Sequence, residues 1–143
     1  MAILCILDLM YNINSQTKTF LKLSAILMAL AISIGAFGAH TLKPYLDNYG
    51  LSIYAKGTSY EFYMTIGLFI ISFISIIIPN SKKVKTSFYL VLSGMIIFSF
   101  SLYTLALTKI MWLGAITPIG GSLMIAGWIV LFFAIKNDIE IKD

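Results

Sequence analysis

Residues 62–78 read FYMTIGLFIISFISIII, an apolar run that no charged side chain interrupts. Three more such runs lie at residues 20–39, 88–107 and 113–135, and only the first of them contains a lysine. Each has close to the ~20 residues that a helix needs to cross a hydrocarbon core of ~30 Å. Lipid offers the backbone no hydrogen-bond partner, and the runs lack the alternation of barrel strands. The sequence therefore predicts an all-α integral membrane protein, a compact bundle of four transmembrane helices.

The composition of the 143-residue chain agrees with a single membrane domain. Hydrophobic residues make up 59% and charged residues 11%, against about 25% charged in a typical soluble domain. The net charge of +4 comes from lysines near the predicted helix ends, with no basic stripe that would follow a nucleic acid. The lone cysteine, Cys5, can form neither an internal disulfide nor a cysteine metal site. We expect the lipid bilayer as partner, no nucleic acid, no metal and no other cofactor.

This pattern divides the chain into an N-terminal extension at residues 1–19, a four-helix membrane domain at 20–135 and a cytoplasmic tail at 136–143. The first eleven residues are apolar, but Asp8 interrupts them and no small-residue cleavage site follows. We interpret them as an uncleaved extension, loosely ordered or on the membrane surface. Thr17-Lys18-Thr19 gives a start signal for the first helix.

Lysines near the helix ends predict the orientation. Seven would lie on one side of the membrane and three on the other: Lys18, Lys22, Lys82, Lys83, Lys85, Lys136 and Lys142 against Lys43, Lys56 and Lys109. The positive-inside rule then places both termini and the loop at 80–86 in the cytoplasm. An aromatic group falls at the outer interface, where amphipathic rings prefer to lie: Tyr45, Tyr49, Tyr54, Tyr60, Tyr63, Tyr103 and Trp112.

Small and weakly polar residues recur at helical spacing within the predicted spans. In the second span, one polar face that should point at protein runs along Glu61, Thr65, Leu68, Ser72 and Ser75. The other spans carry similar rows, so that four stripes would meet in a thin polar seam. Glycines at such positions let helices approach closely, and we expect this packing role for Gly35, Gly38, Gly120, Gly121 and Gly127. Packing alone is the interpretation that we favour for these rows; a functional polar site is the alternative.

The dipeptide Thr117-Pro118 looks like a helix start. Thr117 would cap the helix through its side chain, and Pro118 would occupy the first helical position, where a missing N–H is no loss. The regular part of the fourth helix would then begin here, after a short outer connector at residues 109–116. A kinked continuous helix is the alternative.

Several motifs together resemble those of the YgdD-like family of small bacterial inner-membrane proteins. They are GAFGAH at 35–40, YxxY at 60–63, FSxSLY at 98–103, GxxTPxGG at 114–121 and AGW at 126–128. The resemblance runs from about residue 20 to residue 135 and implies a four-span, multi-pass protein of the plasma (inner) membrane whose biochemical function is uncharacterised. The chain departs from the family at Glu61, where glutamine is common, at Met64, where histidine is common, and at Phe100, where glycine is usual.

Candidate chemistry is confined to the outer ends of the predicted helices, where His40, Glu61, Tyr103 and Lys109 would form one polar layer. A carboxylate at the membrane centre costs ~2.5–3.5 kcal/mol and is a functional hypothesis by default. The alternative, which we favour, is that Glu61 lies in the headgroup region at a helix N-terminus, where dipole and water both stabilise it. His40 is the single histidine, and lone histidines more often cap a helix or bond to a neighbour than bind metal.

No catalytic template fits the sequence, and we expect the protein not to be an enzyme. The glycines at 35 and 38 lack the lysine and strand of a phosphate loop, and one histidine cannot supply a haem pair. The leading hypothesis is an accessory, assembly or packing subunit that contacts other membrane proteins or itself. A small transporter or channel that uses Glu61 is the alternative. A membrane-embedded enzyme is the third and least favoured hypothesis.

Overall fold

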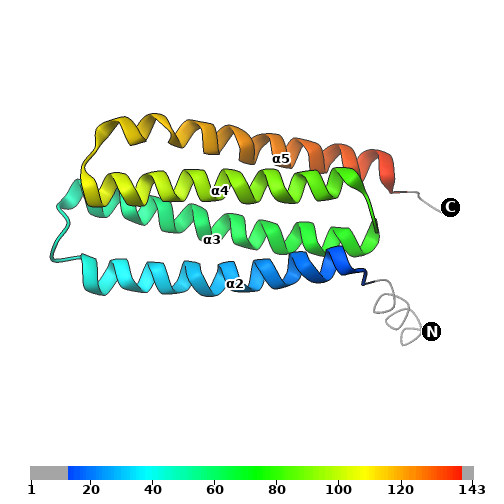
Figure 1. The fold of residues 1–143 in the computed structure, drawn as a ribbon, viewed down its shortest axis with the longest axis horizontal. Helices are drawn as coiled ribbons and strands as arrows, with labels where there is room; N and C mark the ends of the chain where they lie inside the picture. Colours follow the sequence, from blue (N-terminus) through cyan, green and yellow to red (C-terminus); the bar gives the residue numbers. More distant parts are fainter. Residues whose placement is uncertain (1–12, 140–143) are drawn as a thin grey trace.

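The computed structural model describes residues 13–139, which form four long helices that run alternately up and down (Figure 1). In chain order the elements are α2 (Ser15–Phe37), a π-helical turn η1 (Gly38–Leu42), α3 (Asn48–Ile77), α4 (Lys82–Thr108), a 3-10 turn η2 (Met111–Ala115) and α5 (Thr117–Asp138). All four long helices are apolar and long enough to cross a membrane. The predicted all-α architecture of four long apolar helices, each able to span a membrane, is therefore confirmed within this part of the chain.

The helix bounds differ from the hydropathy runs, most of all at α3. This helix begins at Asn48 and not at Phe62, and Asp47 caps it by accepting the Gly50 backbone N–H at 2.7 Å. The missed turns carry serine, lysine and glycine, so they are helical without being uniformly apolar. α2 begins at Ser15, earlier than the predicted start signal, because the Asn14 side chain accepts the Thr17 N–H at 2.8 Å.

The predictions for residues 1–12 and 140–143, a surface extension and the end of a cytoplasmic tail, lie outside the described residues.

The four helices form a flattened bundle. α3 packs against both α2 and α4, and α4 packs against α5, whereas α2 and α5 have no substantial contact with each other in the described structure. Figure 1 shows them in the order α5, α4, α3, α2 across the molecule. A square bundle would bring the first and last helices together. Here the central pair α3 and α4 separates them, so the bundle is less compact than the sequence predicts.

Glycines set the closest helix contact, which joins α4 to α5. A Cβ atom on Gly120 would lie 2.6 Å from the Phe98 backbone nitrogen and 2.7 Å from the Gly94 carbonyl oxygen. One on Gly127 would lie 2.6 Å from a Val91 methyl carbon. Gly121 differs, because a Cβ there would meet nothing nearer than the Phe98 ring edge at 4.0 Å. Of the two adjacent glycines that the sequence predicts as packing positions, only Gly120 lies at a backbone contact.

The apolar core occupies the half of the bundle nearer the two described chain ends. Phe20 of α2 stacks on Phe88 of α4 with ring centroids 3.9 Å apart and planes inclined by 4°. Around this pair the core is made of fully buried aliphatic side chains from the central helices: Leu68, Ile71, Val84, Val91 and Met95. At this level α2 is therefore closed against α4. A second, smaller cluster at the other end of the bundle is built on two tyrosines, Tyr54 and Tyr103.

Candidate functional site

The most unusual side chain in the bundle is Glu61, a carboxyl group that is only 7% exposed near the middle of the 30-residue helix α3. Lys56, which is exposed, lies five residues nearer the loop, or about 7.5 Å along the helix axis. The interpretation that Glu61 lies at the start of a helix is therefore wrong. It fails because α3 continues for several turns beyond the apolar run from which that position was judged.

Tyr103 of α4 holds the carboxyl group of Glu61. Its phenol donates a hydrogen bond to Oε2 at 2.5 Å, while the neighbouring Thr58 hydroxyl lies 3.5 Å from the phenol oxygen. The Tyr103 ring packs on the Tyr54 ring with centroids 4.8 Å apart. Tyr54 in turn donates to the Ile34 carbonyl oxygen at 3.0 Å, which attaches α2 to α3. Side chains from α3 and α4 thus surround the carboxyl group, and α2 is fastened beside it.

The other two members of the predicted polar layer lie elsewhere. Lys109, in a left-handed conformation after α4, binds the loop residue Asp47 with Nζ 2.9 Å from Oδ2. His40, on the π-helical turn, is exposed, and its side chain has no hydrogen bond among the described residues. The structure therefore joins Glu61 to Tyr103 by a hydrogen bond, and among the described residues no hydrogen bond or salt bridge links either of them to His40 or Lys109. The sequence alone places all four residues near helix ends. It does not show how far each helix continues beyond its apolar run, so it does not show which of these residues lie at the same level.

The Asp47–Lys109 pair is a surface contact between two loops. The hydrogen bond from Lys109, followed by the one from the Gly50 N–H, lowers the pKa of Asp47 below its usual value of 3.8. Both side chains of the pair are more than half exposed, so the pair joins the loops without creating a buried site.

A lateral cavity of about 250 Å³ opens beside the Glu61 carboxyl group, between α2 and α4. Its floor is formed by buried side chains, Glu61, Tyr103, Met95 and Ser99. Its rim is formed by exposed apolar side chains, Leu30 of α2 with Ile96 and Phe100 of α4. The cavity thus faces the surroundings of the bundle, and in a membrane those surroundings are acyl chains.

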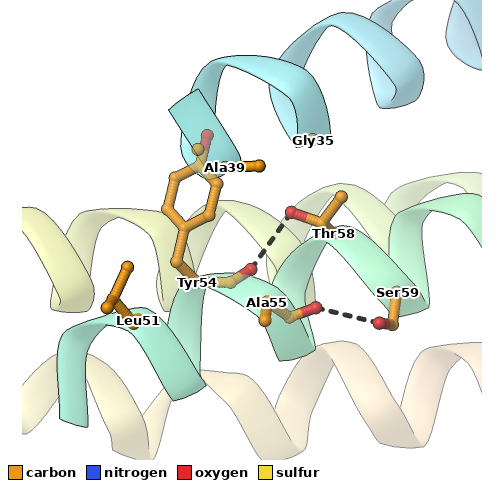
Figure 2. Close-up of a pocket in the computed structure, with 8 residues that line it drawn as sticks. Gly35, Ala39, Leu51, Tyr54, Ala55, Thr58 and Ser59 are labelled. Carbon is orange, nitrogen blue, oxygen red and sulfur yellow. Dashed lines mark hydrogen bonds between the residues drawn. The ribbon is translucent and has the colours of Figure 1, made fainter. Parts of the chain in front are cut away.

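A second groove, of about 380 Å³, lies between α2 with η1 and α3. Figure 2 shows the Tyr54 ring reaching from α3 toward Ala39, with Gly35 facing Thr58. The dashed lines in Figure 2 mark hydroxyls bound to their own helix: Thr58 donates to the Tyr54 carbonyl at 3.1 Å and Ser59 donates to that of Ala55 at 2.9 Å. With these hydroxyls occupied, the groove offers a largely apolar surface.

Small residues in this groove let Tyr54 reach α2. A Cβ on Gly38 would collide with the Tyr54 ring, and one on Gly35 would lie 3.0 Å from the Thr58 methyl carbon. Both glycines are therefore packing positions between α2 and α3, and the contact at Gly38 is the tighter of the two.

Sequence reasoning missed Tyr54, Gly57 and Ser99 as parts of the site. Ser99 of α4 donates to the Gly57 carbonyl oxygen at 2.9 Å, and a Cβ on Gly57 would lie 2.8 Å from the Tyr103 ring. Gly57 lies four residues before Glu61, so the polar row of the second span continues by a further turn. The four-residue spacing from Gly57 to Glu61 could have indicated this turn, but the predicted span began at residue 62 and left Gly57 out.

Thr117 does not cap α5. The N-cap is Ile116 and has no side-chain hydrogen bond, while Thr117 is the first residue of the helix and Pro118 follows in its first turn. The Thr117 hydroxyl instead lies 2.8 Å from that of Ser101, which ties α5 to α4. The regular α-helix does begin at Thr117, directly after the 3-10 turn η2, and Ile116 between the two is itself in the right-handed helical conformation.

The predicted polar face of α3 is buried along its length, but its hydroxyls are used locally. Thr65 donates to the Glu61 carbonyl at 2.7 Å and Ser72 to the Leu68 carbonyl at 2.7 Å. At the far end Ser75 lies 2.7 Å from the hydroxyl of Thr17 in α2. The fully buried Leu68 stands between the two groups. The seam is therefore two separate polar clusters and not one continuous path.

The described residues hold no group of three or more histidine, cysteine or acidic side chains that would bind a metal ion. The available chemistry is a single carboxyl group, one phenol that donates to it, and an apolar cavity that reaches both.

Comparison with known proteins gives consistent matches. The family model described as "Protein of unknown function (DUF423)" matches residues 34–121. A UPF0382 membrane protein of Staphylococcus epidermidis is 45% identical over 117 residues, which cover 82% of this chain and 94% of that protein. The UPF0382 membrane protein YwdK of Bacillus subtilis is 39% identical over 117 residues, 82% of this chain and 95% of the relative. No solved structure matches the chain.

Proposed function

Because the chain belongs to the DUF423/UPF0382 family of bacterial membrane proteins, whose function is uncharacterised, we propose that it is an accessory subunit of the membrane. It would act by packing against other membrane proteins and would catalyse no reaction. The narrower YgdD-like name, which rests on the GAFGAH and GxxTPxGG motifs, is part of this proposal.

The observation that carries the proposal is the interruption of the polar seam. A carrier or channel for ions needs polar groups or a hydrated break along its path. Between the Glu61 cluster and the Thr17–Ser75 cluster the interior is filled by side chains such as Leu68 and Ile71, which are fully buried. The outer faces of α2 and α5, by contrast, are apolar and exposed at Ile32 and Ile125, as expected for helices that meet lipid or other helices.

Photo-crosslinking in living cells tests the accessory function. A photoreactive amino acid would replace Ile32 on α2 or Ile125 on α5, which are 59% and 63% exposed. We expect a discrete adduct with one and the same membrane protein from at least one position. Adducts with lipid alone from both positions would contradict the proposal.

Ion flux in proteoliposomes separates accessory function from transport. Glu61→Gln keeps the size and an acceptor atom but removes the acid, so an accessory protein should show no change in crosslinking or in flux over protein-free vesicles. A proton or cation flux that Glu61→Gln abolishes, with unchanged thermal stability, would favour the transporter instead.

We further propose that the protein lies in the inner membrane with both termini in the cytoplasm. The support is the seven-to-three distribution of lysines together with the up-down topology, which brings the start of α2, the start of α4 and the end of α5 to one end of the bundle (Figure 1). Two exposed loop prolines, Pro44 and Pro79, make a matched pair for cysteine substitution in a Cys5→Ser background. An impermeant thiol reagent on intact cells should label position 44 and spare position 79; the reverse result would invert the orientation.

A further inference from the structure

The cavity beside Glu61 has an apolar opening toward the surroundings of the bundle and an acidic group at its floor. Leu30 and Phe100 border the mouth and are 48% and 69% exposed, whereas Glu61 and Tyr103 on the floor are 7% and 9% exposed. A molecule entering from the acyl chains would therefore meet aliphatic and aromatic walls first and a carboxyl group last.

The carboxyl group has unused binding capacity. Tyr103 donates to Oε2, and no other protein donor within the described part of the chain reaches the carboxyl oxygens. The ion pairs of this part of the chain are Lys83–Asp138 and Lys109–Asp47, so neither uses Glu61. Because the phenol donates its proton, the carboxyl oxygen acts as an acceptor, and a buried acceptor of this kind is stabilised by a cation.

The size of the cavity limits what it can enclose. Its volume of about 250 Å³ is below the range of about 300–1,000 Å³ that usually holds a drug-sized ligand. It therefore suits a head group and the first part of a chain, with the remainder lying between the rim residues of α2 and α4 in the surrounding lipid. The Phe20–Phe88 stack closes these two helices further along the bundle and bounds the opening on that side.

We propose that this cavity is a binding site for a cationic amphiphile with an ammonium head and a single aliphatic chain. The ammonium group donates to the free oxygen of Glu61, and the chain leaves the cavity past Leu30 and Phe100. This site is independent of the partner contacts proposed above, which use the outer faces of α2 and α5.

Equilibrium binding of a radiolabelled long-chain alkylamine to the purified full-length protein in detergent tests the proposal. Binding should be saturable at one molecule per chain, and the alkanol of equal chain length should compete about tenfold less well or worse, because it lacks the charge. Glu61→Gln should weaken alkylamine binding by about tenfold or more, the loss expected for a hydrogen bond to a charged group.

Two further variants locate the site. Leu30→Trp narrows the mouth and should also weaken binding, whereas Asp47→Asn removes a carboxylate outside the cavity and should leave binding unchanged. Equal competition by the alkanol, or equal affinity in wild type and Leu30→Trp, would overturn the proposal. The alkanol comparison uses the wild-type protein, so it decides the matter even where a variant fails to fold.

Discussion

Replacing Gly120 by alanine should separate the two helices that pack most closely, α4 and α5. The added methyl would lie 2.6 Å from the Phe98 nitrogen and 2.7 Å from the Gly94 oxygen, both backbone atoms that no rotamer change can move. Ordinary van der Waals contact starts near 3.4 Å, so the helices must part by several tenths of an ångström or more. Overpacking of a well-packed interior typically costs 1–3 kcal/mol. With two backbone clashes at one methyl, we expect about 3 kcal/mol.

The adjacent Gly121→Ala is a matched control, because it makes the same chemical change in the same helix turn. Its methyl would meet only the Phe98 ring edge at 4.0 Å, and glycine to alanine within a helix is worth roughly 0.5–1 kcal/mol in favour of folding. Unfolding of both variants by sodium dodecyl sulfate in mixed micelles, followed by circular dichroism, measures the difference. Because both variants gain this helix propensity, it cancels, and we expect a gap of about 3 kcal/mol between them from the overpacking at Gly120. Equal midpoints would refute the argument that backbone contact at Gly120 fixes the α4–α5 distance.

Two smaller perturbations test the half of the bundle that contains Tyr54 and Tyr103. Tyr103→Phe removes the hydrogen bond that the phenol donates to the buried Glu61 carboxyl group, and it should lower the free energy of unfolding by about 1–3 kcal/mol. Tyr60→Phe, at a half-exposed phenol one residue before Glu61, is the control and should change the unfolding midpoint little. Because the Lys109 hydrogen bond lowers the pKa of Asp47 below 3.8, the pair stabilises the fold above that pH and its contribution is lost as the pH falls through the lowered value. The difference in unfolding midpoint between wild type and Asp47→Asn should therefore be constant from about pH 7 to about pH 5 and disappear in stronger acid; a difference that persists in acid would show that the charge on Asp47 is not its source.

The four helices could be predicted because uninterrupted apolar runs of this length have one stable form in a bilayer. Their ends could not be read from hydropathy alone. The first turns of α3 contain Ser52, Lys56 and Gly57, which interrupt an apolar run without interrupting a helix. That error moved Glu61 from the interior of a helix to its predicted start, and with it the interpretation of the carboxyl group.

The pairing of Glu61 with Tyr103 could be anticipated, since both residues belong to rows that face the interior. The positions of His40 and Lys109 could not, because they depend on the π-helical turn after α2 and on the left-handed conformation at Lys109. The same limit applies to Thr117, whose hydroxyl can cap a helix or bind Ser101. The local sequence allows either hydrogen bond. The bond to Ser101 forms because α4 packs against the start of α5, which only the tertiary structure determines.

The unequal attachment of the outer helices explains why the cavity lies beside α2. α5 is fitted against α4 at Gly120 and Gly127, where the interface leaves no room for even a methyl group. α2 packs along α3, where Ser24 and Ala31 are fully buried, but its contact with α4 is centred on the Phe20–Phe88 stack near one end. Beyond this stack, no ring contact or hydrogen bond among residues 13–139 joins α2 to α4, and in that interval Leu30 borders the opening beside Glu61. Access to the carboxyl group is thus governed by the packing of α2 against α4.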